Sequence, residues 1–308
     1  MKPLAAAAAA VLALGGATAS APPKVGGCPA FPATSAWNER VDTLPVAADS
    51  ARLIASIGLD RSVHADFGSG LWDGGRIGIP YVVVHGRSTP KSRVAFDYAD
   101  ESDKGPYPIP ANVPIEGQPR PRNDGDRHAL IVDRDSCRLY ELYALHRVGG
   151  RWAAGSGAIF DLRSNRLRPP GWTSADAAGL PILPGLARFE GDAATGVIRH
   201  ALRFTAERTR RAYVYPARHF ASDSSDPALP PMGLRVRLKA SVDISSLPRQ
   251  ARIVAQAMKT YGMILADNGS SWYVSGAPSP RWSNDALHAL GRLTGADFEV
   301  VDTSSLRP

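Results

Sequence analysis

The sequence predicts a mainly β fold, built as a single antiparallel β-sandwich or jelly-roll-like domain with a few peripheral helices. Glycine (29 residues) and proline (26 residues) punctuate many short apolar runs, which is typical of β-rich chains. Residues 199–205 and 234–240 alternate apolar with polar side chains at period two, which indicates strands with one packed and one wet face. Antiparallel sheets accommodate such strands. An α+β domain is the alternative, because residues 248–261 have a clear helical pattern.

Apolar runs bounded by turn residues predict the strands in chain order. We expect them at 79–84, 92–98, 128–133, 137–145, 158–162, 199–205, 211–215, 234–240, 263–266, 271–275 and 298–302. Residues 133–136 (DRDS) supply the turn of a hairpin between the third and fourth of these strands.

Helix start and stop signals flank three further segments. These are 47–57, 248–261 and 283–291. Pro248 stands at the start of the second segment, where proline is favourable, and Gly262 follows its end. Ser283 or Asn284 supplies an N-cap for the third segment, which ends at Gly291.

The N-terminus has the pattern of a secretory signal peptide. Lys2 provides a positive charge, residues 4–14 form an apolar run too short to span a bilayer, and small residues follow. We expect residues 1–21 to be this signal and residues 22–308 to form one β-rich domain with an N-terminal arm at 22–46. No other segment is apolar enough to cross a membrane. The sequence therefore predicts a secreted protein, extracellular or periplasmic.

Cys28 and Cys137 are the only cysteines of the chain. Two cysteines in an oxidising compartment predict one disulfide, which would tie the N-terminal arm to the body of the domain. The alternative is two free thiols or a cysteine nucleophile, but no cysteine-hydrolase signature surrounds Cys137.

Charge and motifs exclude several classes of protein. The formal charge is +7, but the basic residues are spread along the chain, so we expect no nucleic-acid partner. The sequence has no HExxH, no GxSxG, no P-loop, no GxGxxG after a strand and no zinc-like Cys/His spacing. We therefore expect no cofactor and no metal, and we set aside the common metalloproteases, α/β-hydrolases and dinucleotide enzymes. The alternative is a metal site whose ligands are scattered in the sequence.

Two long coils are the segments in which we expect a site, because long loops in compact domains are usually functional. Residues 99–127 are expected to pack on a sheet rather than to act as a linker. Residues 163–185 place Trp172 beside hydroxyls and Asp176, with Arg168 upstream. Trp172 is either a sugar-binding platform or a lid over the core.

Asp161 and Asp176 are our candidates for catalytic acid and base. Glycoside hydrolysis needs two carboxyl groups roughly 5–10 Å apart, and Asp161 ends a predicted strand that leads into the second coil. His219 follows the predicted strand 211–215, at a strand-to-loop exit, and can act as a base near neutral pH. His200 is the second assisting histidine, with a hydrogen-bonded core role as the alternative.

The candidates for substrate binding share positions next to these residues or on the predicted hairpin. They are Trp172, Arg168, Tyr213, His128 and Glu141. His128 and Glu141 alternate with apolar residues, so each either lines a site or is paired in the core. Asp267, at the end of the predicted strand 263–266, is a further carboxylate that could take part.

Five stretches of the chain carry a resemblance to other proteins. They are FPATSAWNERVDTLPV (31–46), FDYADESDKGPYPIP (96–110), DRHALIVDRDSCRLYELY (126–143), GWTSADAAGLPILPGL (171–186) and YGMILADNGSSWYVSGAP (261–278). The chain resembles, over nearly all of its mature length, a family of secreted bacterial and fungal proteins whose activity is not established. The resemblance implies one co-linear domain and secretion, and it assigns no catalytic residue.

These observations together predict a secreted carbohydrate-active enzyme that hydrolyses an extracellular polysaccharide. The first alternative is a polysaccharide lyase on a uronate-containing polymer, with His219 or Tyr213 as base. The second is a non-catalytic protein that binds carbohydrate or a cell surface. The expected partner is the polysaccharide, and the expected state is a monomer.

Overall fold

The computed structural model describes residues 21–120 and 125–306. Strands predominate, and the predicted mainly β fold with a few helices is confirmed. The α-helices of the described residues are α1 (Ser50–Ile57), α2 (Arg249–Thr260) and α3 (Asn284–His288). All three lie within the segments that the sequence predicts to be helical. The predicted signal peptide, apart from its last residue, lies outside the described residues and stays a prediction.

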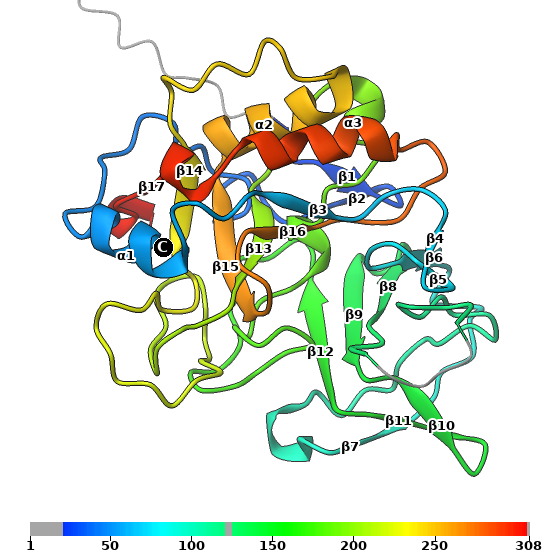
Figure 1. Cartoon of the computed structure of the whole chain (residues 1–308). Coiled ribbons are helices and arrows are strands. Elements are labelled where there is room, and N and C mark those ends of the chain that lie inside the picture. Colours follow the sequence, from blue (N-terminus) through cyan, green and yellow to red (C-terminus); the bar gives the residue numbers. More distant parts are fainter. Residues whose placement is uncertain (1–20, 121–124, 307–308) are drawn as a thin grey trace, which may run out of the picture.

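The larger sheet has six strands. Their spatial order is β17 (Phe298–Val300), β14 (Arg235–Leu238), β15 (Met263–Asn268), β13 (Leu202–Ala206), β16 (Tyr273–Ser275) and β3 (His64–Asp66). The helix α2 packs on β14 through the apolar face that its sequence predicts, and α3 packs on β3. Figure 1 shows α2 and α3 next to each other at one end of the molecule, with the hairpin of β10 (His146–Val148) and β11 (Arg151–Ala154) at the other end.

The second sheet has four strands, and both of its faces are buried. Their order is β12 (Ser156–Asp161), β9 (Arg138–Tyr143), β8 (Ala129–Asp133) and β6 (Tyr81–Val84). The predicted hairpin is confirmed, since β8 and β9 are antiparallel and joined by the turn at 134–137. One face packs against the N-terminal arm and Leu183, and the other against Tyr107 and Ile115 of the coil 99–127. The described part of that coil therefore packs on a sheet, as predicted.

Short strands and single-turn helices complete the fold. The short strands are β1 (Lys24–Val25), β2 (Cys28–Pro29), β4 (Leu71–Trp72), β5 (Gly75–Arg76), β7 (Val94–Phe96), β10 (His146–Val148) and β11 (Arg151–Ala154). The 3-10 helices are η1 (Ala99–Glu101), η2 (Leu183–Gly185), η3 (Ala193–Thr195), η4 (Ala289–Arg292), η5 (Gly295–Asp297) and η6 (Ser304–Leu306). Among the described strands, eight pairings are antiparallel and four are parallel.

Cys28 and Cys137 form the predicted disulfide, with their Cα atoms 5.4 Å apart. It joins β2 to the residue before β9, and so attaches the N-terminal arm to the four-stranded sheet. The alternative of free thiols is excluded. Within the described ranges, no helix combines the length and the apolar character that crossing a bilayer requires.

Two expectations about strands are wrong. Residues 211–215 form no strand, and only Tyr213 makes an isolated bridge, to Met232. The alternating strands also lack the expected wet face, because Arg203 is 4% and Arg235 is 3% exposed. Both strands lie inside the six-stranded sheet, where protein covers both faces. Arg235 donates to the backbone carbonyls of Tyr261, Ala36 and Glu39 in place of water.

Candidate functional site

A cavity of about 380 Å³ lies where the two larger sheets meet. Tyr143, at the end of β9, and Ser156, at the start of β12, line it from the four-stranded sheet. Asp267, near the end of β15, lines it from the six-stranded sheet, and residues 173–177 of the second coil form a further wall. A cavity of this size is in the range that holds small ligands, roughly 300–1,000 Å³.

An irregularity in the pairing of β15 with β13 lies next to Asp267, where the sheet lines the cavity. The register between the parallel strands β13 and β15 shifts after Phe204, which leaves Ala266 as an extra residue in β15. The free carbonyl of Ala266 accepts a hydrogen bond from the Ala178 amide at 2.9 Å, and the carbonyl of Ala178 accepts one from the His219 amide at 3.2 Å. Bulges of this kind often redirect side chains near sites. Three segments far apart in sequence are thereby tied together.

Arg203 holds two carboxylates at the base of the cavity. Its Nε and Nη2 donate to the two oxygens of Asp176, each at 2.8 Å, and Nη2 also donates to Asp267 Oδ2 at 3.1 Å. Its Nη1 donates to Ser275 Oγ at 2.6 Å. Because one nitrogen contacts both carboxylates, their nearest oxygens lie within about 6 Å of each other.

The two carboxylates differ in accessibility and in acidity. The Asp176 side chain is fully buried, whereas that of Asp267 is 23% exposed. Burial raises the pKa of Asp267 to about 7, and repulsion from Asp176 adds to the rise, against the attraction of Arg203. Burial opposes the charge of Arg203, but Asp176 and Asp267 hold the pKa of its guanidinium above its ordinary value. Asp267 is therefore a carboxyl that can carry a proton near neutral pH.

His219 lines the same cavity with a defined tautomer in its neutral form. Its Nδ1 lies 2.8 Å from the carbonyl oxygen of Ala177. A carbonyl has no hydrogen to give, so Nδ1 carries the proton and donates it. The lone pair of the neutral ring is then on Nε2, which is the atom that can act as a base.

The other walls carry hydroxyls and further carboxylates. Tyr98 is 55% exposed, and Glu101 accepts a hydrogen bond from the Thr173 amide at 2.9 Å. The exposed Asp126 faces the cavity from the side of the coil 99–127. Acidic side chains therefore outnumber basic ones along this lining.

His128 and Glu141 are buried behind the cavity. His128 Nδ1 lies 2.6 Å from Glu116 Oε2, and Nε2 lies 2.9 Å from the carbonyl oxygen of Ala175. Burial opposes its charge, but Glu116 raises the pKa of His128 to about 9. Glu141 accepts hydrogen bonds from the amides of Ile182 and Leu183, and burial raises its pKa to about 7. Both residues have paired roles in the core, one of the two alternatives that the sequence leaves open.

Asp161, His200 and Tyr213 do not line this cavity, and neither do Arg168 and Trp172. Asp161 is exposed at the end of β12, and its Oδ1 accepts a hydrogen bond from the Arg163 amide at 2.9 Å. His200 is fully buried, with Nδ1 2.8 Å from the Ala201 carbonyl oxygen and Nε2 3.2 Å from Asp192 Oδ2. Tyr213 is half-buried against the main core.

Arg168 is a structural contact rather than a free cation. Its guanidinium donates to the carbonyls of Thr173 and Glu101 at 2.7 Å each, and to Asp103 at 2.6 Å. Trp172 is half-buried, with its ring 5.4 Å from that guanidinium. Arg168 thus holds the second coil beside η1.

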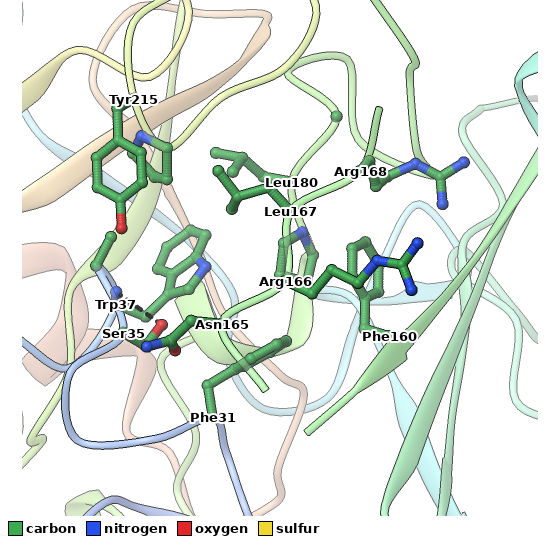
Figure 2. A pocket seen from close by; sticks show the side chains of 14 residues that line it. Phe31, Ser35, Trp37, Phe160, Asn165, Arg166, Leu167, Arg168, Leu180 and Tyr215 are labelled. Atoms are coloured by element: carbon green, nitrogen blue, oxygen red, sulfur yellow. Dashed lines mark hydrogen bonds between the residues drawn. The ribbon is translucent and has the colours of Figure 1, made fainter. Parts of the chain in front are cut away.

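A second hollow on this coil is too small for a sugar. Figure 2 shows Trp37, Tyr215 and Leu180 lining it, with the guanidinium groups of Arg166 and Arg168 directed away from the Trp37 indole. Its volume is about 30 Å³, far below the roughly 300–1,000 Å³ of small-molecule pockets. The cavity at Asp267 is therefore the better candidate site.

Asp176 and His219 are the predicted catalytic residues that the structure brings together. Asp267 was a weaker candidate from its place at a strand end, and it becomes the central one. Arg203 was missed, because a charged residue in an alternating strand indicates a wet face. Its two apolar neighbours, Leu202 and Phe204, were the available signal of its burial.

In comparisons with known proteins, no protein-family model matches this chain, and neither does any curated protein or solved structure.

Proposed function

We propose that the protein hydrolyses glycosidic bonds of an extracellular polysaccharide, with Asp267 as general acid and His219 as general base. The proposal rests on the position and the acidity of Asp267. Asp267 shares a guanidinium nitrogen with Asp176, is partly exposed to a cavity of about 380 Å³, and has a pKa raised to about 7. A general acid is most effective when its pKa lies near the working pH.

The three residues have separate roles. Protonated Asp267 donates its proton to the glycosidic oxygen as the bond to the sugar breaks. His219 Nε2 takes a proton from the water that attacks the sugar carbon. Asp176 is a positioning residue, because its buried side chain holds Arg203 and keeps the pKa of Asp267 high.

The lining favours a neutral glycan over a uronate polymer. Glu101 and Asp126 would repel a polyanion, and the guanidinium of Arg203 is already paired with Asp176. Hydroxyls of Tyr98 and Tyr143 are suited to sugar hydroxyls, and aromatic rings to sugar faces. The lyase alternative is therefore second, although His219 could also serve as its base.

Action outside the cytoplasm is part of the proposal. The Cys28–Cys137 disulfide supports it, because structural disulfides persist in oxidising compartments. The N-terminal sequence pattern supports it independently.

A binding function without catalysis is the second candidate, and Trp72 favours it. This residue stands in the β4–β5 hairpin with 80% of its surface exposed, where it could stack on a polymer surface. The polysaccharide panel described next distinguishes hydrolysis from binding without catalysis.

The test is a panel of neutral and uronate-containing polysaccharides, with measurement of new reducing ends and of ultraviolet absorbance. We expect new reducing ends without an unsaturated product. Asp267→Asn and His219→Gln should each lower kcat by about 10²–10⁴-fold, the usual contribution of acid–base catalysis. An unsaturated product would indicate a lyase, and binding without shortened product would indicate a binding protein.

Matched controls make the site assignment specific. Asp161→Asn changes a carboxylate outside the cavity, and we expect kcat within about twofold of the original. His146→Gln removes a histidine whose Nδ1 makes the same kind of contact, 2.8 Å from the Ala144 carbonyl oxygen, but away from the cavity. Full activity of Asp267→Asn would overturn the assignment of the acid.

A further inference from the structure

Glu116, Asp126 and His128 bring three ligand types together beside the cavity. One donor atom from each residue can be chosen so that all three lie within 4.8 Å of one another. Glu116 and Asp126 come from the coil 99–127, and His128 directly precedes β8. Two carboxylates and one imidazole form a common ligand set for divalent transition-metal ions.

The imidazole is already oriented as a metal ligand. His128 Nε2 lies 2.9 Å from the Ala175 carbonyl oxygen, to which it donates. Metal-binding histidines usually donate their second ring N–H to such an acceptor, which fixes the ring. The remaining nitrogen, Nδ1, points toward Glu116 Oε2 at 2.6 Å. The carbonyl of Ala175 thus supplies the outer support that a metal-ligating ring requires.

Glu116 and Asp126 have carboxylate oxygens that accept no hydrogen bond from the described residues. Among the described residues, none donates a hydrogen bond to Glu116 Oε1 or to either carboxylate oxygen of Asp126. Glu116 is surrounded by protein, yet its side chain is 24% exposed, so it lies in a recess. These oxygens are therefore available to a cation that takes the place of the proton between His128 Nδ1 and Glu116.

We propose that these three residues bind one divalent cation of the zinc class in the wall of the cavity. His128 Nδ1 and one oxygen from each carboxylate would give three protein ligands, the number found in open, catalytic zinc sites. Asp126 lines the cavity, so the fourth position faces it. A nitrogen ligand favours Zn²⁺ over Ca²⁺ and Mg²⁺, which prefer oxygen alone.

Formation of the site needs a local rearrangement. Ligands of a tetrahedral zinc ion lie about 3.4 Å apart, given bonds of about 2.1 Å. His128 Nδ1 and Glu116 Oε2, 2.6 Å apart, would widen to this spacing as the zinc ion replaces the proton between them, and the exposed Asp126 side chain would approach from within 4.8 Å. The open position would hold water or a sugar hydroxyl. This inference goes beyond the proposed hydrolysis and does not depend on it.

The test measures metal binding by the full chain without a histidine tag. After treatment with a chelator, the protein is titrated with ZnCl₂ in a calorimeter, and in parallel with MnCl₂ and CaCl₂. We expect one Zn²⁺ per chain, bound more tightly than Ca²⁺. Asp126→Asn should weaken zinc binding at least tenfold, because it removes one anionic ligand from an exposed position that does not support the fold.

The matched control is Asp60→Asn, which removes an exposed carboxylate outside the ligand set and should bind Zn²⁺ as the unchanged protein does. Zinc should also raise the melting temperature of the unchanged protein and of Asp60→Asn, but not that of Asp126→Asn. Absence of saturable zinc binding, tighter binding of Ca²⁺ than of Zn²⁺, or equal zinc affinity in Asp126→Asn would each overturn the proposal.

Discussion

Arg203 and Asp176 form a bidentate ion pair in the interior, with both N–O distances at 2.8 Å. The pair joins β13 of the six-stranded sheet to the coil that crosses toward the four-stranded sheet. The same guanidinium reaches Asp267 at 3.1 Å. One buried cation therefore attaches the coil and lowers the pKa of the carboxyl that faces the cavity, against the rise that burial causes.

Removal of Asp176 should strongly destabilise the fold. Asp176→Asn leaves the charge of Arg203 with only the partly exposed Asp267 as its partner, and the loss of one member of a buried pair costs about 3–5 kcal/mol. Asp161→Asn, at an exposed strand end, should change the free energy of unfolding by about 0.5 kcal/mol or less. Urea denaturation of both variants measures the difference. Equal stability of the two variants would show that the pair is not needed.

The pH dependence of activity should report Asp267. The acid works when protonated, so kcat/KM should fall as the pH rises through about 7. Arg203→Lys removes the bidentate contact that stabilises the ionised carboxylates, so this fall should move to higher pH. Arg237→Lys, in the Arg237–Glu299 pair between β14 and β17, is the control and should leave the profile in place. A shift of the Arg203→Lys profile to lower pH would contradict this electrostatic account.

Glu141 should make the protein less stable as the pH rises. Its pKa is about 7 in the fold, above the ordinary 4.5, so the folded state binds more protons between these values. The stability that this proton provides is complete below pH 4.5 and is lost as the pH rises through 7. The effect is on the order of 3 kcal/mol.

Glu141→Gln isolates this effect, because an amide stays neutral at every pH. The free energy of unfolding of the variant, relative to that of the unchanged protein, should increase as the pH rises from 5 to 8, the window around the pKa of about 7. Urea unfolding at a series of pH values measures the trend. A constant difference across this range would mean that Glu141 does not take up a proton on folding.

Loss of the disulfide should lower the stability of the whole chain. Cys28 and Cys137 are 109 residues apart, and the loop-entropy model assigns about 4–5 kcal/mol to a closed loop of that length. The double variant Cys28→Ser/Cys137→Ser should unfold at lower urea concentration than the oxidised protein. Reductant should move the oxidised protein toward the variant and leave the variant unchanged. Equal midpoints without reductant would argue against this contribution.

Much of the fold could be predicted because its signals are local. The helix 248–261, with Pro248 before it and Gly262 after it, appears as α2 (Arg249–Thr260). Its apolar period of 3.6 residues depends only on the backbone geometry of the helix. The turn at 134–137 likewise follows from residues that adopt turn conformations in short peptides. The prediction of a strand at 211–215 was wrong, because this segment packs on the core without a partner strand.

The site could be predicted only in part. Asp176 and His219 were identified from their loop positions, but Asp161 and His200 had equally suitable residue types and lie elsewhere. Neighbouring residues in the sequence cannot distinguish these cases, since the cavity lining comes from separate segments spread between Tyr98 and Asn268.

The sequence alone determined the mainly β class, the positions of the helices and most strands, and the pairing of its two cysteines. These follow from periodicity, turn chemistry and the presence of a single possible partner. Tertiary structure decided which charges are buried. Arg203 has the same local pattern as an exposed strand residue, and it can leave water only because Asp176 and Asp267 meet it from distant segments. That meeting is a property of packing, and the burial that accompanies it raises the pKa of Asp267.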